Sequence, residues 1–185
     1  MQITTWNIRG CNNALKKCLL KRRIDKDKSG IISLQETKCS REELESIAQK
    51  VWKGCESVAI NARGGAGGLG ILWNPRVVLL SGFLATTCTL YVEFHILGTR
   101  IRGFISNVYG PLRANQKPEF LESLIDLKTL VKYKAYIIGG DFNLIRSLDE
   151  KKGGIRNLND VSTLFNNTIN DLDLIDVRTS NGIFT

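Results

Sequence analysis

The chain reads Tyr136-Ile137-Ile138-Gly139-Gly140-Asp141-Phe142-Asn143, an apolar run followed by two glycines and then two polar side chains two positions apart. Side chains at positions i and i+2 of an extended segment point to the same face, so we expect Asp141 and Asn143 to project together while Phe142 turns toward a core. The glycines permit a sharp turn or the close approach of a ligand. A carboxylate beside an amide suits a site for a phosphate and a metal ion, although this stretch alone leaves open that Asp141 is only a turn or cap residue.

Three more apolar runs end in polar groups of the same kind. Ile3-Thr4-Thr5-Trp6 leads into Asn7, Ile31-Ile32-Ser33-Leu34-Gln35 leads into Glu36, and Ile101-Arg102-Gly103-Phe104-Ile105-Ser106 leads into Asn107 and Tyr109. Four strands that each deliver a carboxylate, an amide or a phenol at the carboxyl end predict one polar floor at one rim of a sheet.

Length and composition favour one intracellular domain over residues 1–185. A chain of 185 residues is long enough to bury a core. The net charge of +8 suggests a polyanionic partner, with solvated lysines as the alternative. Five cysteines without a CxxC pair indicate neither a disulfide framework nor a zinc site, and a reducing compartment is the simplest interpretation. No apolar run approaches the roughly 20 residues of a membrane span, and the first residues predict a strand rather than a signal peptide.

Short strands alternate with four helices along the chain. We expect strands over 2–8, 31–36, 57–61, 71–73, 77–81, 88–97, 101–109, 136–141 and 174–177. The helices are expected over 12–24, with Leu15, Cys18, Leu19 and Leu20 on the buried side, from a Ser40–Glu43 capping box to residue 52, after Pro118, and after residue 159. This order favours an α/β sandwich of two mostly antiparallel sheets with helices outside, and it leaves a doubly wound sheet open.

Several conspicuous features have plain structural explanations. The run from Arg63 to Gly70 lacks the GK[ST] ending of a phosphate loop and leads into a strand, so it predicts a tight turn or bulge. His95 lies on the polar face of an alternating strand, which does not indicate a catalytic base. The basic residues of 16–28 favour a solvated helix face over a phosphate contact, and both interpretations remain open for Arg146, Lys151, Lys152 and Arg156.

Four motifs in this order resemble the endonuclease/exonuclease/phosphatase superfamily. They are Trp6-Asn7-Ile8-Arg9-Gly10, Gln35-Glu36-Thr37, Asn107-Val108-Tyr109-Gly110-Pro111 and Gly139-Gly140-Asp141-Phe142-Asn143. The resemblance is closest to the apurinic/apyrimidinic-like endonuclease of LINE-type (non-LTR) retrotransposons. It implies a four-layered, DNase I-like α/β sandwich.

The resemblance also implies roles for these residues. Glu36 is then the principal ligand of Mg²⁺, for which Mn²⁺ can substitute, and Asn7 lies beside it. Asp141 orients or deprotonates the attacking water, while Asn143 and Tyr109 hold the phosphate. Asn107, Arg9 and Thr185 are expected to contact the substrate. The implied activity is metal-dependent hydrolysis of a phosphodiester that nicks DNA.

The sequence departs from the family pattern near Thr185. This residue matches the threonine of the family's Phe-Thr-Trp stretch, and no residue of the chain corresponds to the histidine of the family's Ser-Asp-His triplet. The resemblance therefore implies a domain without its last strands, from a parent with a reverse transcriptase downstream. We expect a monomeric, nuclear protein that binds DNA and no membrane. A catalytically inactive nucleic-acid-binding remnant and a phosphatase acting on a phosphoinositide, nucleotide or sphingolipid are the alternatives.

Overall fold

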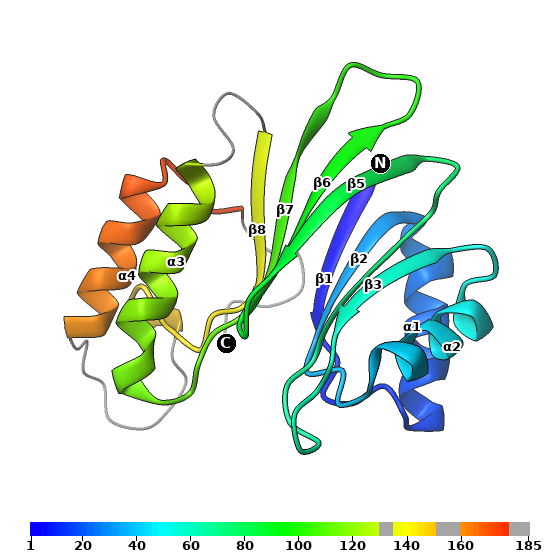
Figure 1. The fold of residues 1–185 in the computed structure, drawn as a ribbon, viewed down its shortest axis with the longest axis horizontal. Coiled ribbons are helices and arrows are strands. Elements are labelled where there is room, and N and C mark those ends of the chain that lie inside the picture. Colours follow the sequence, from blue (N-terminus) through cyan, green and yellow to red (C-terminus); the bar gives the residue numbers. More distant parts are fainter. Residues whose placement is uncertain (130–134, 151–159, 178–185) are drawn as a thin grey trace. The chain divides into compact units, whose positions relative to one another are not determined.

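Figure 1 shows the computed structural model of the chain, which describes residues 1–129, 135–150 and 160–177. The chain divides into two compact units. Unit 1 comprises Met1–Tyr109 and Tyr133–Gly140, and unit 2 comprises Gly110–Lys132 and Asp141–Thr185. The chain thus passes from one unit to the other directly after Tyr109 and directly before Asp141.

The first sheet of unit 1 has the strand order β1-β2-β4-β3. Its strands are β1 (Gln2–Asn7), β2 (Ser29–Gln35), β3 (Glu56–Ile60) and β4 (Leu69–Trp73). β1 and β2 run parallel because helix α1 (Ala14–Asp27) carries the chain back between them, whereas β4 is antiparallel to both of its neighbours. Helices α1 and α2 (Arg41–Val51) bury Leu20, Ile24, Leu44 and Ile47 in one apolar cluster with Ile32 and Leu34 of β2.

The second sheet has the order β5-β6-β7-β8. Its strands are β5 (Val78–Ala85), β6 (Thr89–Ile96), β7 (Arg102–Tyr109) and β8 (Ala135–Asp141). A second apolar cluster joins Ile31 and Ile71 of the first sheet to Leu90, Val92 and Ile105 of the second, so the two sheets pack face to face. The predicted α/β sandwich of mostly antiparallel sheets is confirmed, and the doubly wound alternative is excluded.

Unit 2 contains helices α3 (Lys117–Thr129) and α4 (Asp160–Asp171) and the short 3-10 helices η1 (Ala114–Gln116) and η2 (Leu148–Glu150). The ring of Phe142 lies 5.1 Å from that of Phe165 in α4 and 6.5 Å from that of Phe120 in α3, measured between ring centroids. Phe142 therefore turns into an aromatic core, as the sequence predicts.

Helix α1 begins after its N-cap Asn13, and of the four residues predicted on its buried side only Leu20 is buried. Leu15 is 65% exposed, Leu19 is 37% exposed and Cys18 is also exposed, whereas Leu20 and Ile24 are buried. Leu20 and Ile24, one helical turn apart, form the row of α1 that packs on the sheet.

Two strand predictions also differ from the structure. Residues 174–177 form no strand, and Ile175 and Val177 are 89% and 82% exposed. In β6, Tyr91 on the predicted polar face is buried, because its ring stacks on Phe104 at 5.0 Å and meets Tyr136 edge-on. None of the helices within the described residues has both the length and the apolar composition that a membrane crossing requires.

Candidate functional site

The carboxyl ends of β1 and β2 bring Asn7 and Glu36 together. Because the two strands are parallel and in register, with Asn7 opposite Gln35, the residues that follow them lie at one edge of the sheet. Asn7 Nδ2 donates to Glu36 Oε1 over 3.0 Å. The predicted meeting of these two strand ends is therefore a feature of the fold.

Left-handed backbone concentrates in the loops that follow these strands. Arg9, Glu36 and Lys38 have φ values of 52°, 50° and 54°, a conformation that residues other than glycine rarely adopt. Main-chain hydrogen bonds hold the two loops in place, from Gly10 N to Glu36 O at 2.7 Å and from Cys11 N to Thr37 O at 2.9 Å. Strain of this kind persists only where the surroundings enforce it, and it is common at binding sites.

The carboxylate of Glu36 is held in its charged form. Burial raises the pKa of this group, but hydrogen bonds from Asn7, Tyr109 and Lys38 outweigh burial, so the pKa is lowered from its ordinary value. Lys38 Nζ lies 3.5 Å from Glu36 Oε2. Tyr109 is the last residue of β7, so three strand ends of unit 1 supply one cluster, which we call the Glu36 cluster: Asn7, Glu36, Lys38 and Tyr109.

Lys38 was not singled out from the sequence. Its position two residues after Glu36 is the signal that could have indicated it, because a basic side chain there has the reach to pair with the carboxylate.

Asn107 occupies a different place from the one expected of a substrate contact. Its side chain is fully buried, and its Nδ2 donates to the carbonyls of Leu34 and Gly70, each over 3.0 Å. Its Oδ1 accepts from Gln35 Nε2, which also reaches Thr5 Oγ1 at 3.0 Å. Because both ends of the amide bind protein atoms, Asn107 connects the two sheets and does not face a substrate.

In unit 2, Asp141 and Asn143 form a local turn. β8 ends at Asp141, and the Oδ1 atom of Asp141 accepts from the main-chain nitrogen of Asn143 at 3.0 Å. Asn143 has a φ of 51°, its Nδ2 donates to Gly110 O at 2.7 Å, and its own carbonyl accepts from Lys117 Nζ at 2.7 Å. The two residues lie together because of this turn, not because they alternate along an extended segment as predicted.

The glycines before Asp141 allow close packing. A Cβ atom on Gly140 would stand 2.0 Å from Val108 O, and the φ of 151° at Gly140 is itself open only to glycine. Gly140 therefore brings β8 against β7, which differs from both the sharp turn and the close approach of a ligand that the sequence suggests.

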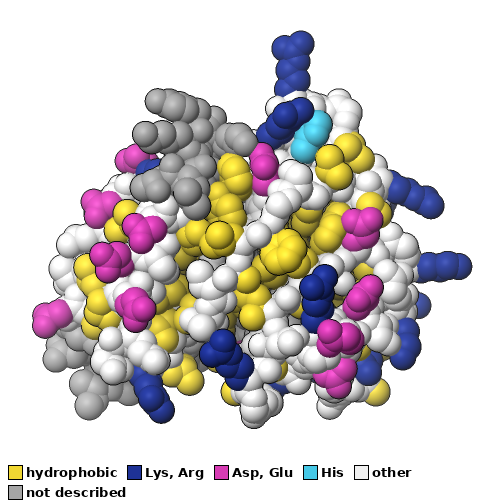
Figure 2. All heavy atoms as spheres, viewed as in Figure 1, with side chains coloured by type: hydrophobic (Ala, Val, Ile, Leu, Met, Phe, Trp, Pro, Cys, Tyr) yellow, Lys and Arg dark blue, Asp and Glu magenta, His cyan; other side chains and the backbone are white. Residues whose placement is uncertain are grey.

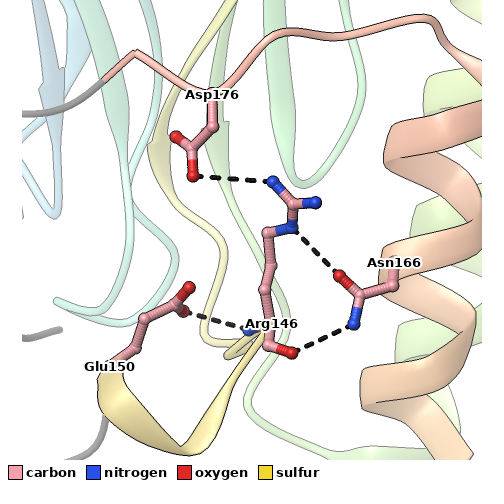
Figure 3. A network of polar contacts seen from close by, with 4 residues as sticks. All are labelled: Arg146, Glu150, Asn166 and Asp176. Carbon is pink, nitrogen blue, oxygen red and sulfur yellow. Dashed lines mark hydrogen bonds and ion pairs between the residues drawn. The ribbon is translucent and has the colours of Figure 1, made fainter.

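Arg146 holds the segment after Asn143 against helix α4 (Figure 3). Its Nε donates to Asn166 Oδ1 at 3.0 Å, and Asn166 Nδ2 donates back to Arg146 O at 3.0 Å. The Nη1 atom lies 3.5 Å from Asp176 Oδ2, and Glu150 accepts from the main-chain nitrogen of Arg146. These contacts give Arg146 a structural role within unit 2.

Arg9 is exposed on the loop after β1. His95 Nε2 lies 3.0 Å from Thr99 O in the turn between β6 and β7. Thr185, Lys151, Lys152 and Arg156 lie outside the described residues.

The positive charge of the chain belongs to unit 1. Unit 1 carries 17 Lys and Arg against 8 Asp and Glu, whereas unit 2 carries 9 against 10. Figure 2 shows acidic side chains over α3 and α4, and Lys and Arg side chains along the edge of unit 1 where α1 lies. The Glu36 cluster therefore lies in the unit whose net charge favours a polyanion.

The donors of the Glu36 cluster fit a hard divalent cation. Glu36 offers a charged carboxylate. The side-chain nitrogen of Asn7 donates to Glu36, and the side-chain oxygen of Asn7 is the kind of atom that binds such an ion. Within residues 1–129, 135–150 and 160–177 no three His, Cys, Asp or Glu side chains gather into a cage. One carboxylate and one amide match Mg²⁺, which usually keeps several waters and binds few protein ligands.

Comparison with known proteins gives both a family and a fold. The sequence model of the endonuclease/exonuclease/phosphatase family matches residues 4–176. Among solved structures, the endonuclease domain of TRAS1, a telomere-specific non-LTR retrotransposon, is similar with a TM-score of 0.68 at 17% identity, over 91% of this chain and 70% of that one.

Two further structures show how widely the fold is shared. The AP endonuclease LMAP from Leishmania major has a TM-score of 0.67 at 18% identity over 91% of this chain and 65% of that one. The mannosyl-6-phosphatase Bt3783 from Bacteroides thetaiotaomicron has a TM-score of 0.63 at 13% identity over 76% of this chain and 64% of that one.

The chain thus spans less than two thirds of the length of the Leishmania and Bacteroides chains. No curated protein matches its sequence. The family match covers nearly the whole chain and includes the Glu36 cluster, so the chain belongs to the endonuclease/exonuclease/phosphatase family.

Proposed function

We propose that the chain is a Mg²⁺-dependent endonuclease that nicks DNA by attack of water on a backbone phosphodiester. The observation that carries the proposal is the Glu36 cluster, in which an amide, a phenol and an ammonium keep one carboxylate charged at a strained loop. The net positive charge of unit 1 supports a polyanionic substrate.

Residues of unit 1 bind the cation and the phosphate in this proposal. Glu36 and Asn7 hold Mg²⁺, or Mn²⁺ in its place, which when bound neutralises charge on the phosphoryl oxygens. The hydroxyl of Tyr109 donates to a nonbridging oxygen of the phosphate that is cut. Arg9, which is exposed on the neighbouring loop, contacts another phosphate of the DNA strand.

Residues of unit 2 act on the water and the phosphate. Asp141 orients or deprotonates the attacking water, and Asn143 donates from its amide to the phosphate. Asp141 already accepts from the main chain of Asn143, and Asn143 Nδ2 donates to Gly110 O, so both side chains are held in place within unit 2. We propose that these residues act on the same phosphodiester as the Glu36 cluster, with Thr185 as a further substrate contact.

The remaining parts of the proposal follow from the DNA substrate and the resemblance. The protein acts as a monomer in the nucleus. A phosphatase is the second candidate, because the fold is also that of the Bacteroides mannosyl-6-phosphatase. Release of inorganic phosphate from small phosphomonoesters, without nicking of DNA, would favour that candidate.

Nicking of supercoiled plasmid tests the proposal, with and without Mg²⁺, for the wild type, Glu36→Gln and Asp141→Asn. We expect metal-dependent nicking that each substitution lowers on the order of 10²-fold or more, since each removes a group used in the transition state. Glu45→Gln, which neutralises an exposed glutamate of α2, is the matched control and should nick like the wild type. Equal nicking by all four proteins would identify a contaminant and overturn the proposal.

A further inference from the structure

A hollow of about 470 Å³ opens in unit 1 beside Tyr109. Four strand ends form it, with Ile60 closing β3, Leu69 opening β4, Ala85 closing β5 and Tyr109 closing β7. Its volume falls within the roughly 300–1,000 Å³ of typical ligand sites.

The hollow lies at the same sheet edge as the Glu36 cluster. Leu69 pairs with Gln35, the residue before Glu36. Beyond this pair, the main-chain nitrogens of Thr37 and Lys38 donate to Gly68 O at 3.1 Å and to Gly67 O at 3.0 Å. The wall of the hollow is therefore bonded directly to the loop that carries Glu36, and Tyr109 belongs to both sites.

One wall is a two-residue hairpin. Arg63 N donates to Ala66 O at 3.0 Å and Ala66 N donates to Arg63 O at 3.1 Å, which closes a turn over Gly64 and Gly65 at φ values of 57° and 75°. The prediction of a tight turn in this glycine run is thus confirmed. The hairpin places the exposed Arg63 on the rim, and Thr86 and Thr87 from the β5–β6 turn complete the rim.

We propose that this hollow holds one nucleotide of the DNA strand, next to the phosphodiester that is cut. The inference rests on the proposed function and names a subsite for it. The base lies against the apolar floor of Ile60, Leu69 and Ala85 and the ring of Tyr109, while Arg63 binds the flanking phosphate. Stacking on an aromatic ring tolerates any base, so the subsite contributes affinity and position more than sequence choice.

The chemistry of the lining favours a nucleotide over a free anion. A phosphate alone would leave the apolar floor in water, and an apolar ligand would make no use of the exposed guanidinium of Arg63. The base of a nucleotide matches the apolar floor and its phosphate matches Arg63. The positive charge of unit 1 favours a nucleotide that is part of a polyanionic strand.

Binding of a fluorescein-labelled single-stranded oligonucleotide, followed by anisotropy without added metal, tests the subsite. Ala85→Trp fills the hollow and should weaken binding about tenfold, the loss expected when one stacked base is displaced. Arg63→Ala should weaken binding severalfold and lower the slope of log affinity against log salt by about 0.7, because one phosphate contact is lost.

Each variant has a matched control outside the hollow. Ser81→Trp adds the same bulk to an exposed position of β5, and Arg100→Ala removes the same charge from the turn between β6 and β7. Both controls should bind within about twofold of the wild type, a shift below the cost of one lost contact. If Ala85→Trp binds like Ser81→Trp and Arg63→Ala like Arg100→Ala, the subsite is wrong.

The plasmid assay separates this inference from the proposed function. Wild-type nicking that Ala85→Trp leaves unchanged would overturn the subsite and keep the endonuclease. If oligonucleotide binding depends on Ala85 and Arg63 but the protein does not nick plasmid, the proposed subsite is supported and the proposed endonuclease activity is contradicted.

Discussion

At the residue scale, Glu36 combines a left-handed backbone with a carboxylate that accepts from Asn7, Tyr109 and Lys38. Each of these hydrogen bonds stabilises the charged form of the carboxyl group, and together they outweigh the effect of burial on its pKa. The Glu36 side chain can therefore bind a cation at neutral pH without first losing a proton.

The lowered pKa predicts how stability depends on pH. A carboxyl whose pKa falls on folding contributes stability that is fully present above its ordinary value near 4.5 and is lost as pH falls through the folded value. The difference in unfolding free energy between the wild type and Glu36→Gln should therefore be constant at neutral pH and shrink below about pH 4.5.

Urea unfolding of the two proteins at a series of pH values measures this difference. Glu45→Gln provides the background for removal of an exposed glutamate. A Glu36→Gln difference that grew on acidification would mean that the folded protein prefers the protonated acid, contrary to the hydrogen bonds described.

The ends of the predicted strands indicate the residues of the Glu36 cluster, but they do not reveal that Asn107 is buried. Asn7, Glu36 and Tyr109 each follow an apolar run, which predicts a common edge of one sheet. The structure brings them together from two sheets, because β7 belongs to the second sheet and β1 and β2 belong to the first. Asn107 stands in the same kind of position, but its amide is buried between sheets. Nothing local distinguishes a polar residue that faces solvent from one that bonds to Leu34 and Gly70, which lie 73 and 37 residues earlier in the chain.

At the element scale, Asn107 bonds β7 to β2 and β4. Asn107→Ala should lower the free energy of unfolding by about 2 kcal/mol or more, because it removes three buried hydrogen bonds, one from Gln35 Nε2 and two to main-chain carbonyls. Chemical denaturation measures the loss, with the exposed Asn12→Ala as the control. Equal stability of the two variants would show that the buried hydrogen bonds of Asn107 contribute nothing to the free energy of unfolding.

Helix α2 allows a second prediction. Ser40 accepts from Glu43 N at 3.1 Å, and Glu43 Oε2 accepts from Ser40 N at 2.7 Å, which is the capping box read from the sequence. Ser40→Ala should cost about 1 kcal/mol, whereas Ser46→Ala on the exposed face of the same helix should cost nothing, since alanine favours a helix interior. Thermal unfolding compares them, and an unchanged midpoint for Ser40→Ala would contradict the capping role.

The element boundaries show where pattern reading succeeds and fails. The capping box fixes the start of α2 by short-range chemistry, and the structure agrees. The buried face of α1 depends on packing against the sheet, which buries Leu20 and Ile24 and leaves Leu15 exposed, and the sequence of the helix alone does not determine that choice. Ile175 and Val177 lie on either side of Asp176 in strand-like alternation, but no strand among the described residues pairs with them, and both side chains are exposed.

At the scale of the whole molecule, the proposed catalytic residues are divided between two units. Asn7, Glu36 and Tyr109 belong to unit 1, whereas Asp141 and Asn143 belong to unit 2. The sequence order of the motifs, together with the family match over residues 4–176, is what joins them in one proposed function. The architecture followed from alternating strands and helices, but the choice between a sandwich and a doubly wound sheet needed the pairing of β4 between β2 and β3.

The central claim is that both units act on one phosphodiester, and a double-mutant cycle of DNA nicking tests it most directly. The rates to compare are those of the wild type, Glu36→Gln, Asp141→Asn and the protein with both substitutions. Residues that act as a unit have non-additive effects, so the double variant should lose little more than the worse single variant. Single losses that multiply in the double variant would contradict the claim, because the two carboxylates would then act independently.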